Sequence, residues 1–195
     1  MIPQNSSCGF FDSEYKMEEQ LPRNFTISFK EISVDGKKNV RILFNHKSQV
    51  GDMINDNAYK DDFYRYHDIF HYSFATLLGW SPCTRAMLKR KRKSSELLDE
   101  IEDGARATIT EEALSMIIFN EAKHKDYFKS SKKVSKTTLR IIKEMTENFE
   151  VKVRSTSEWE KAILKSYNIF RSLVQNNGGT VEFNLMTRKI TFVPI

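Results

Sequence analysis

The chain has 195 residues, 39% hydrophobic and 29% charged, with a formal net charge of +5. This balance suits a globular domain with a sizeable core and excludes global disorder. No stretch reaches the roughly twenty apolar residues that span a bilayer, and the N-terminus lacks a signal-peptide pattern, so we expect a cytoplasmic protein without membrane contact. The two cysteines, Cys8 and Cys83, are far apart and outside any CxxC motif. This spacing argues against a disulfide scaffold and against a thiolate zinc site.

The first part of the chain predicts a flexible arm followed by a β-hairpin. Residues 1–22 are polar and show no periodicity, which favours a poorly fixed segment. In residues 24–45, apolar and polar side chains alternate on both sides of Asp35-Gly36, a dipeptide that readily adopts positive φ. We therefore expect a hairpin here, as part of a single domain over residues 1–195.

Residues 60–125 contain several predicted helices, and 95–124 is the most helical stretch of the chain. A helix is predicted over about 61–78, because acidic residues start it, an apolar stripe follows at helical spacing, and Gly79 ends it. Ser81-Pro82 is a suitable cap and first-turn pair for a short helix that leads into a basic block.

The rest of the chain predicts further helices and a second hairpin. Residues 95–124 form one long helix or two helices broken near Gly104 or Thr110. Residues 136–176 carry two helical patterns, and 180–193 alternate as a hairpin does. Because a lone hairpin is marginal in water, we expect the two hairpins to pair or to pack on the helices. The predicted fold class is α+β, predominantly α.

The first candidate site is the segment from Tyr66 to His71. His67 and His71 are four residues apart and Asp68 precedes His71 by three, so either pair meets on one helix face. An imidazole among aromatic side chains needs a partner, and a metal ion or a carboxylate is a natural one. The competing interpretation is a core histidine that hydrogen-bonds to a backbone carbonyl.

The second candidate site is the acidic stretch that contains Glu102, Asp103 and Glu112. If residues 95–124 form one continuous helix, Glu112 and Ser115 fall on its apolar face. A carboxylate directed into a core is costly unless it is paired or coordinated, so Glu112 is the best candidate metal ligand. Converging carboxylates suit Mg²⁺ or Mn²⁺, and two nearby histidines would tolerate Mn²⁺ or Zn²⁺.

A basic block lies between these two sites and could hold a triphosphate, with arginine able to grip it bidentately. The same block could instead be a solvated charged face, or could contact nucleic acid together with the basic region 129–143. Its candidate phosphate-binding residues are Arg85, Lys89, Arg90, Arg92 and Lys93.

Several of these segments together resemble MazG-like proteins, the all-α nucleoside triphosphate pyrophosphohydrolases, in a divergent branch with flanking β-hairpins. The segments are Asp61-Asp62-Phe63-Tyr64-Arg65-Tyr66-His67-Asp68-Ile69-Phe70-His71, Leu78-Gly79-Trp80-Ser81-Pro82, Lys89-Arg90-Lys91-Arg92-Lys93, Glu102-Asp103-Gly104-Ala105-Arg106 and Glu111-Glu112-Ala113. The resemblance implies a MazG-like helical bundle over 60–125, a Mg²⁺ site built from an ExxE pair and an ExxD pair, and a dimer or tetramer.

The two pairs can be placed in two registers. In one, Asp99 and Glu102 form the first pair, and Glu112 and Ser115 form the second, with Ser in place of Asp. The other register uses the pairs Asp68 with His71 and Glu100 with Asp103, with His in place of Glu.

The resemblance predicts a metal-dependent nucleotide pyrophosphohydrolase that cleaves a (d)NTP to the (d)NMP and pyrophosphate. The alternative is a non-catalytic nucleic-acid- or protein-binding module built on a degenerate MazG-like fold. The predicted catalytic residues are Glu112 and His71. The predicted ligands of Mg²⁺ or Mn²⁺ are His67, Asp68, His71, Glu102, Asp103 and Glu112.

Overall fold

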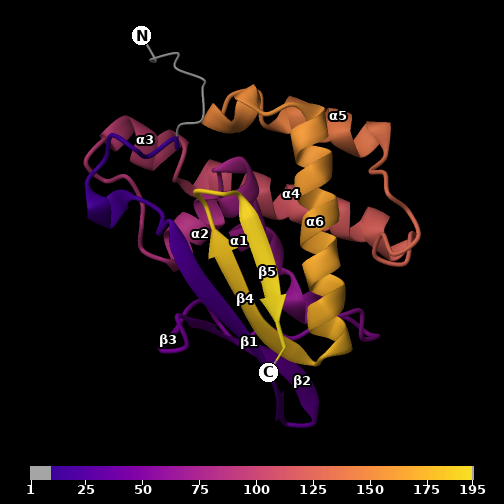
Figure 1. The fold of residues 1–195 in the computed structure, drawn as a ribbon. Helices are drawn as coiled ribbons and strands as arrows, with labels where there is room; N and C mark the ends of the chain where they lie inside the picture. Colours follow the sequence, from indigo (N-terminus) through magenta and orange to yellow (C-terminus); the bar gives the residue numbers. More distant parts are fainter. Residues whose placement is uncertain (1–9, 195) are drawn as a thin grey trace.

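The computed structural model describes residues 10–194 and shows an antiparallel sheet packed against a group of helices (Figure 1). The helices are α1 (Asp68–Leu78), α2 (Pro82–Met87), α3 (Glu96–Ile101), α4 (Ala105–Lys123), α5 (Lys136–Met145) and α6 (Thr156–Gln175). The strands are β1 (Asn24–Val34), β2 (Lys37–Phe44), β3 (Ser48–Gln49), β4 (Gly178–Asn184) and β5 (Lys189–Val193). Short 3-10 turns are η1 (Met17–Glu19), η2 (Tyr64–Tyr66) and η3 (Glu150–Val153).

The two predicted hairpins are confirmed, and they join into one five-stranded sheet with the order β3-β2-β1-β4-β5. The first and last parts of the chain meet where β1 pairs with β4, with Ile27 opposite Val181. Phe25, Ile27 and Phe29 of β1 are all buried, and α6 runs beside β4 and β5 (Figure 1). The predicted α+β class, dominated by helices, is therefore correct.

The predicted flexible arm is wrong from residue 10 onward, whereas residues 1–9 lie outside the described part of the chain. Asp12 is only 1% exposed. Its carboxylate accepts hydrogen bonds from the backbone N–H of Leu21 (2.7 Å) and from Arg85 (2.9 Å). A buried carboxylate with a cationic partner fixes the polar segment that carries it, and composition alone does not reveal such a partner.

Helix α1 starts later than the sequence predicts, at Asp68 instead of residue 61 or 62. The carboxylate of Asp56 accepts the backbone N–H groups of Asp62 (3.0 Å), Phe63 (3.1 Å) and Arg65 (3.0 Å). Phe63 adopts a positive φ of 66°. The acidic residues expected in the first helical turn therefore lie in a loop, and the helix proper starts after η2.

The predicted helix over 95–124 is broken at Gly104, one of the two positions expected for a break. A Cβ at Gly104 would lie 2.0 Å from the carbonyl oxygen of Glu100, so no other residue fits this junction without a shift of the backbone. The break resets the helical phase. In α4 the buried face carries Glu111, Ser115 and Ile118, whereas Glu112 is half-buried at its edge.

Large aromatic side chains fill the space between α1, α6 and the sheet. Phe70 of α1 packs on Tyr167 and Phe170 of α6, with ring centroids 4.6 and 5.7 Å apart. Trp80 and Trp159 close the other end of this core and are both fully buried. Among the described residues no helix combines the length and the apolar character needed to cross a membrane.

Candidate metal site

Two histidines at the start of α1 direct the same ring nitrogen toward one point. His67 Nδ1 lies 3.0 Å from the carbonyl oxygen of Tyr64, and His71 Nδ1 lies 2.9 Å from Oε1 of Glu111. Because a carbonyl and a carboxylate oxygen only accept, Nδ1 of each ring carries the proton in the neutral imidazole. This tautomer leaves both Nε2 atoms with a lone pair available to a cation.

Glu111 of α4 holds His71 in this orientation. The Glu111 side chain is fully buried and accepts three hydrogen bonds, from His71, from Ser81 Oγ (2.7 Å) and from the backbone N–H of Cys83 (2.9 Å). A carboxylate that bonds to the distal nitrogen of a metal-binding histidine fixes its tautomer and raises its basicity. Glu111 therefore positions His71 and joins α1, α2 and α4 at one place.

Glu112 completes a set of three candidate ligands. Its Oε1 lies 3.3 Å from His71 Nε2, and the ligand atoms of His67, His71 and Glu112 all lie within 4.8 Å of one another. Asp68 adds a second carboxylate beside them, with Oδ1 at 3.2 Å from His67 Nε2. His71 Nε2 is buried and has no hydrogen-bond partner within residues 10–194. An orphaned imidazole nitrogen that faces carboxylate oxygens fits a site for a divalent metal ion.

The protonation states agree with this interpretation for His67 and Glu112. Burial lowers the pKa of His67, so the ring is neutral at physiological pH. Burial raises the pKa of Glu112, but hydrogen bonding and charge from His71 outweigh it and lower that pKa to about 2. Metal ligands need a neutral histidine and an ionised carboxylate.

His71 behaves differently because it lies between two glutamates. Burial opposes its protonated form, but the charges of Glu111 and Cys83 and the hydrogen bonds to both together outweigh burial and hold the pKa of His71 well above its ordinary range. Without metal, therefore, a proton on Nε2 supplies the positive charge between the two carboxylates. A divalent cation would replace this proton and supply the same compensation.

The donor set suits a borderline metal ion better than a hard one. Mg²⁺ prefers oxygen ligands in octahedral geometry, whereas two imidazole nitrogens with a carboxylate suit Mn²⁺, Zn²⁺ and related ions. The residues present therefore fit the expected divalent metal, with Mn²⁺ favoured over Mg²⁺.

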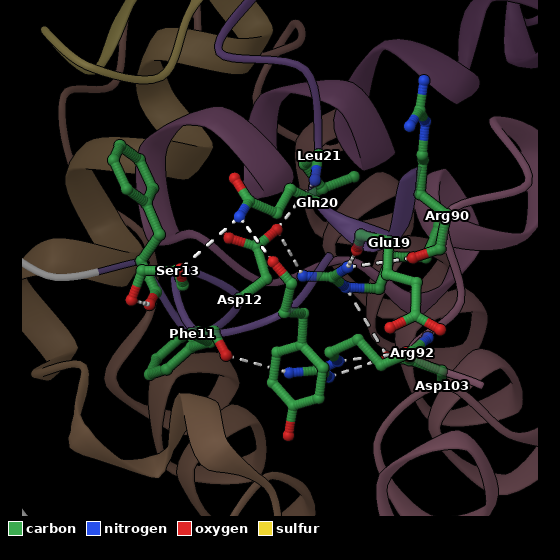
Figure 2. A network of polar contacts seen from close by, with 12 residues as sticks. Phe11, Asp12, Ser13, Glu19, Gln20, Leu21, Arg90, Arg92 and Asp103 are labelled. Carbon is green, nitrogen blue, oxygen red and sulfur yellow. Dashed lines mark hydrogen bonds and ion pairs between the residues drawn. The ribbon is translucent and has the colours of Figure 1, made fainter. Parts of the chain in front are cut away.

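Two of the predicted metal ligands, Glu102 and Asp103, lie outside this site, and Asp103 belongs to the network of polar contacts shown in Figure 2. Asp103 is fully buried, and its Oδ1 lies 2.7 Å from Nη2 of Arg92. Arg92 also binds Glu150 at 2.8 Å. Glu102 accepts the backbone N–H of Glu150 at 2.9 Å. Glu102 and Asp103 thus serve the junction of α3, α4 and η3, and the expectation that they bind metal with His67 and His71 is wrong.

The predicted phosphate-binding residues divide into buried and exposed ones. Arg85 and Arg92 are 2% and 0% exposed. Arg85 binds Asp12 and the carbonyl oxygens of Glu19 and Arg90. Arg92 binds Asp103 and the carbonyl oxygen of Phe11 (Figure 2). The prediction that these two arginines grip a triphosphate does not agree with their burial among protein partners.

Lys89, Arg90 and Lys93 remain accessible at the end of α2. Lys89 adopts a positive φ of 55°, and Arg90 donates to the carbonyl oxygen of Met17 at 3.0 Å. These side chains keep the capacity to meet an anion. His46 and His124, expected at the surface, are both exposed.

The structure combines halves of the two registers that the sequence allows. His71 on α1 lies 3.3 Å from Glu112 on α4, Asp68 lies beside His67, and Ser115 follows Glu112 on the same helix. The Ser115 hydroxyl is buried, with no hydrogen-bond partner in the part of the chain that the structure describes. Sequence reasoning missed Glu111 because it continued one helix through Gly104. The sequence did contain an indication, the pair Glu111-Glu112. Adjacent residues of an α-helix point in different directions, so only one of the two glutamates can lie on the buried face.

An α+β fold with a buried histidine and glutamate cluster between two helices defines a candidate metal-binding protein. The family model of the MazG C-terminal domain matches residues 6–195, so the chain belongs to this family. This match confirms the resemblance to MazG-like proteins. No curated protein and no solved structure matches the chain significantly.

Proposed function

We propose that the protein is a metal-dependent nucleotide pyrophosphohydrolase that converts a (d)NTP to the (d)NMP and pyrophosphate. The observation that carries this proposal is the convergence of His67, His71 and the Glu112 carboxylate, whose ligand atoms lie within 4.8 Å of one another. Membership of the MazG C-terminal domain family supports it.

Each side chain at the site has a distinct role in this proposal. His67, His71 and Glu112 hold a divalent cation, which would neutralise phosphate charge and lower the pKa of a water molecule. Glu111 fixes His71 through Nδ1. Asp68, whose Oδ1 lies beside His67 Nε2, orients the attacking water and accepts its proton.

A hollow beside the metal site gives the nucleotide a place to bind. It has a volume of about 250 Å³ and is lined by Phe44, Val50, Met87, Lys89 and Arg90 among others. A Cβ at Gly51 would lie 3.7 Å from Met87 Sδ and 3.8 Å from Asp68 Oδ2, so Gly51 lies between a residue that lines the hollow and Asp68. We propose that the apolar floor receives the nucleoside and that Lys89 and Arg90 meet the phosphates.

We also propose that the protein forms a homo-oligomer through an exposed stripe of α4. Ile109 and Met116 are 67% and 40% exposed. They lie three residues before and four residues after Glu112, so they share its helix face. A second copy seated on this stripe would close the exposed side of the metal site.

The test is release of nucleoside monophosphate and pyrophosphate from a panel of (d)NTPs with Mn²⁺, Mg²⁺ or Zn²⁺. We expect turnover with at least one metal, and its loss in Glu112→Gln and His71→Ala. His124→Ala, at an exposed histidine on the C-cap of α4, is the matched control and retains activity. Folded protein that turns over no nucleotide with any metal contradicts the proposal.

The alternative function, a nucleic-acid-binding module, makes a different prediction for Glu112→Gln. Affinity for nucleic acid would fall steeply with salt and would be indifferent to Glu112→Gln. Burial of Arg85 and Arg92 removes two charges from the surface that would carry such binding.

A further inference from the structure

We propose that Cys83 is a fourth ligand of the metal, so that the centre is a nitrogen, oxygen and sulfur site that selects Zn²⁺-like ions over Mg²⁺. This inference rests on the metal site of the proposed function and adds the identity of the ion. It also reverses the expectation, drawn from cysteine spacing, that the chain has no thiolate ligand.

Cys83 is fixed in the first turn of α2 with its sulfur at the site. Its backbone N–H donates to Glu111 Oε2 at 2.9 Å, and the residue is 4% exposed. The ligand atoms of His71, Cys83 and Glu111 lie within 4.8 Å of one another. Cys83 Sγ itself lies 3.7 Å from Oε1 of Glu112. One carboxylate oxygen thus lies beside both the sulfur and His71 Nε2.

The separations of these donors match the edges of a tetrahedral zinc site. With metal–nitrogen and metal–oxygen bonds of about 2.0 Å and a metal–sulfur bond of about 2.3 Å, tetrahedral angles place nitrogen about 3.3 Å and sulfur about 3.5 Å from the oxygen. The observed distances from Glu112 Oε1 are 3.3 Å to His71 Nε2 and 3.7 Å to Cys83 Sγ. Two edges of this donor set, both from Glu112 Oε1, are therefore close to the spacing that a zinc ion imposes.

Two further features point from this cysteine to a ligand. His71 is only 1% exposed, and its Nε2 atom faces the same carboxylate oxygen. Nε2 has no hydrogen-bond partner among residues 10–194. The described contacts of the thiol are with Glu112 at 3.7 Å, with the carbonyl oxygen of Thr108 at 3.8 Å and with the His71 imidazole. The soft donor and the His71 imidazole are both buried, and they face the same carboxylate oxygen.

The chemistry of this donor set determines which ion binds. Thiolate and imidazole ligands favour Zn²⁺ and Co²⁺, whereas Mg²⁺ gains little from sulfur. Coordination releases the thiol proton to solvent. The Glu112 side chain is 45% exposed, so a bound ion would remain accessible from solvent to a phosphate oxygen.

The experiment is titration of the metal-free full chain with Co²⁺ and Zn²⁺. We expect Co²⁺ to produce a near-ultraviolet thiolate-to-metal charge-transfer band in the wild type and in Cys8→Ser, the matched control for the other cysteine. Cys83→Ser should lose this band while keeping the visible ligand-field bands of Co²⁺ bound to nitrogen and oxygen. Its Zn²⁺ affinity should fall more than about tenfold, with no comparable loss for Mn²⁺.

Two outcomes overturn the inference. One is a wild type without the charge-transfer band at saturating Co²⁺, and the other is Cys83→Ser with unchanged band and unchanged Zn²⁺ affinity. Circular dichroism of the metal-free variants shows that they are folded. Failure of the proposed function looks different, because the band would be present while no (d)NTP is cleaved.

Discussion

His71 and Glu111 are joined by a hydrogen bond of 2.9 Å between Nδ1 and Oε1, and both residues are at most 1% exposed. This bond links α1 to α4 and decides which nitrogen of His71 faces the metal site. The same carboxylate accepts the Cys83 backbone N–H, so it also fixes the start of α2. Glu111 is therefore the residue on which the geometry of the site depends.

Replacing Glu111 by Gln should weaken metal binding about 10- to 100-fold, the usual effect of losing a supporting partner of a ligand. The amide can accept from His71 with its oxygen, but its NH₂ group then faces the Cys83 N–H, and two donors oppose each other. Calorimetric titration with Mn²⁺ measures the loss. Glu147→Gln, at an exposed position outside the site, is the control. Unchanged affinity in Glu111→Gln would show that His71 needs no such support.

Glu102 should make stability fall as pH rises. Burial, followed by the charge of Glu150, raises its pKa from 4.5 to about 7. Between these values the folded state binds more protons than the unfolded state, so the free energy of unfolding decreases with increasing pH. The effect amounts to at most about 3 kcal/mol.

The matched variants for this prediction are Glu102→Gln and Glu100→Gln. Glu102→Gln keeps an acceptor for the Glu150 N–H and should flatten the decline between pH 4.5 and 7, whereas exposed Glu100→Gln should not. Urea denaturation at a series of pH values supplies the test. Equal pH profiles for wild type and Glu102→Gln would contradict the prediction.

Arg92 should prove essential for stability and not for phosphate binding. Arg92→Ala leaves Asp103 and Glu150 without the guanidinium that contacts both, and breaking such a buried pair costs about 3–5 kcal/mol. Thermal and urea unfolding measure this loss, with Asp103→Asn as a milder variant that should shift stability in the same direction. Arg90→Ala, at a partly exposed position, should leave stability nearly unchanged. A higher KM with full stability in Arg92→Ala would favour the phosphate-binding role instead.

The sequence predicts turns and helix caps well, because these depend on residues that are neighbours in the chain. The Asp35-Gly36 turn and the cap at Ser81, which accepts from Thr84 N–H, lie where the residues indicate. Ion pairs between residues far apart in the chain determine which charged side chains are buried. The buried network of Asp12, Arg85, Asp103 and Arg92 joins three separate segments, and no spacing rule relates segments so far apart in the chain. The basic block therefore looked like one surface, although two of its arginines are buried.

The candidate site was half predictable for a similar reason. His67, Asp68 and His71 lie within two turns of one helix, and the structure does place them together. Glu111 and Cys83 come from other elements. The placement of Glu111 depends on the break between helices at Gly104. If one helix continued from residue 95, its apolar face would carry Glu112, whereas in α4 the buried residue is Glu111.

The exposed stripe of α4 leads to the last prediction. If a second copy covers Ile109 and Met116, Met116→Glu places a charge in an apolar contact and should convert the oligomer to a monomer. Analytical ultracentrifugation measures the change. Met186→Glu, at a methionine that is 63% exposed near the C-terminus, is the control and should leave the assembly intact.

Because Glu112 lies on the same stripe, the monomer should also lose pyrophosphate release while it still binds Co²⁺. A wild type that is already monomeric at all concentrations would remove the homo-oligomer from the proposal and leave the metal site to act within one chain.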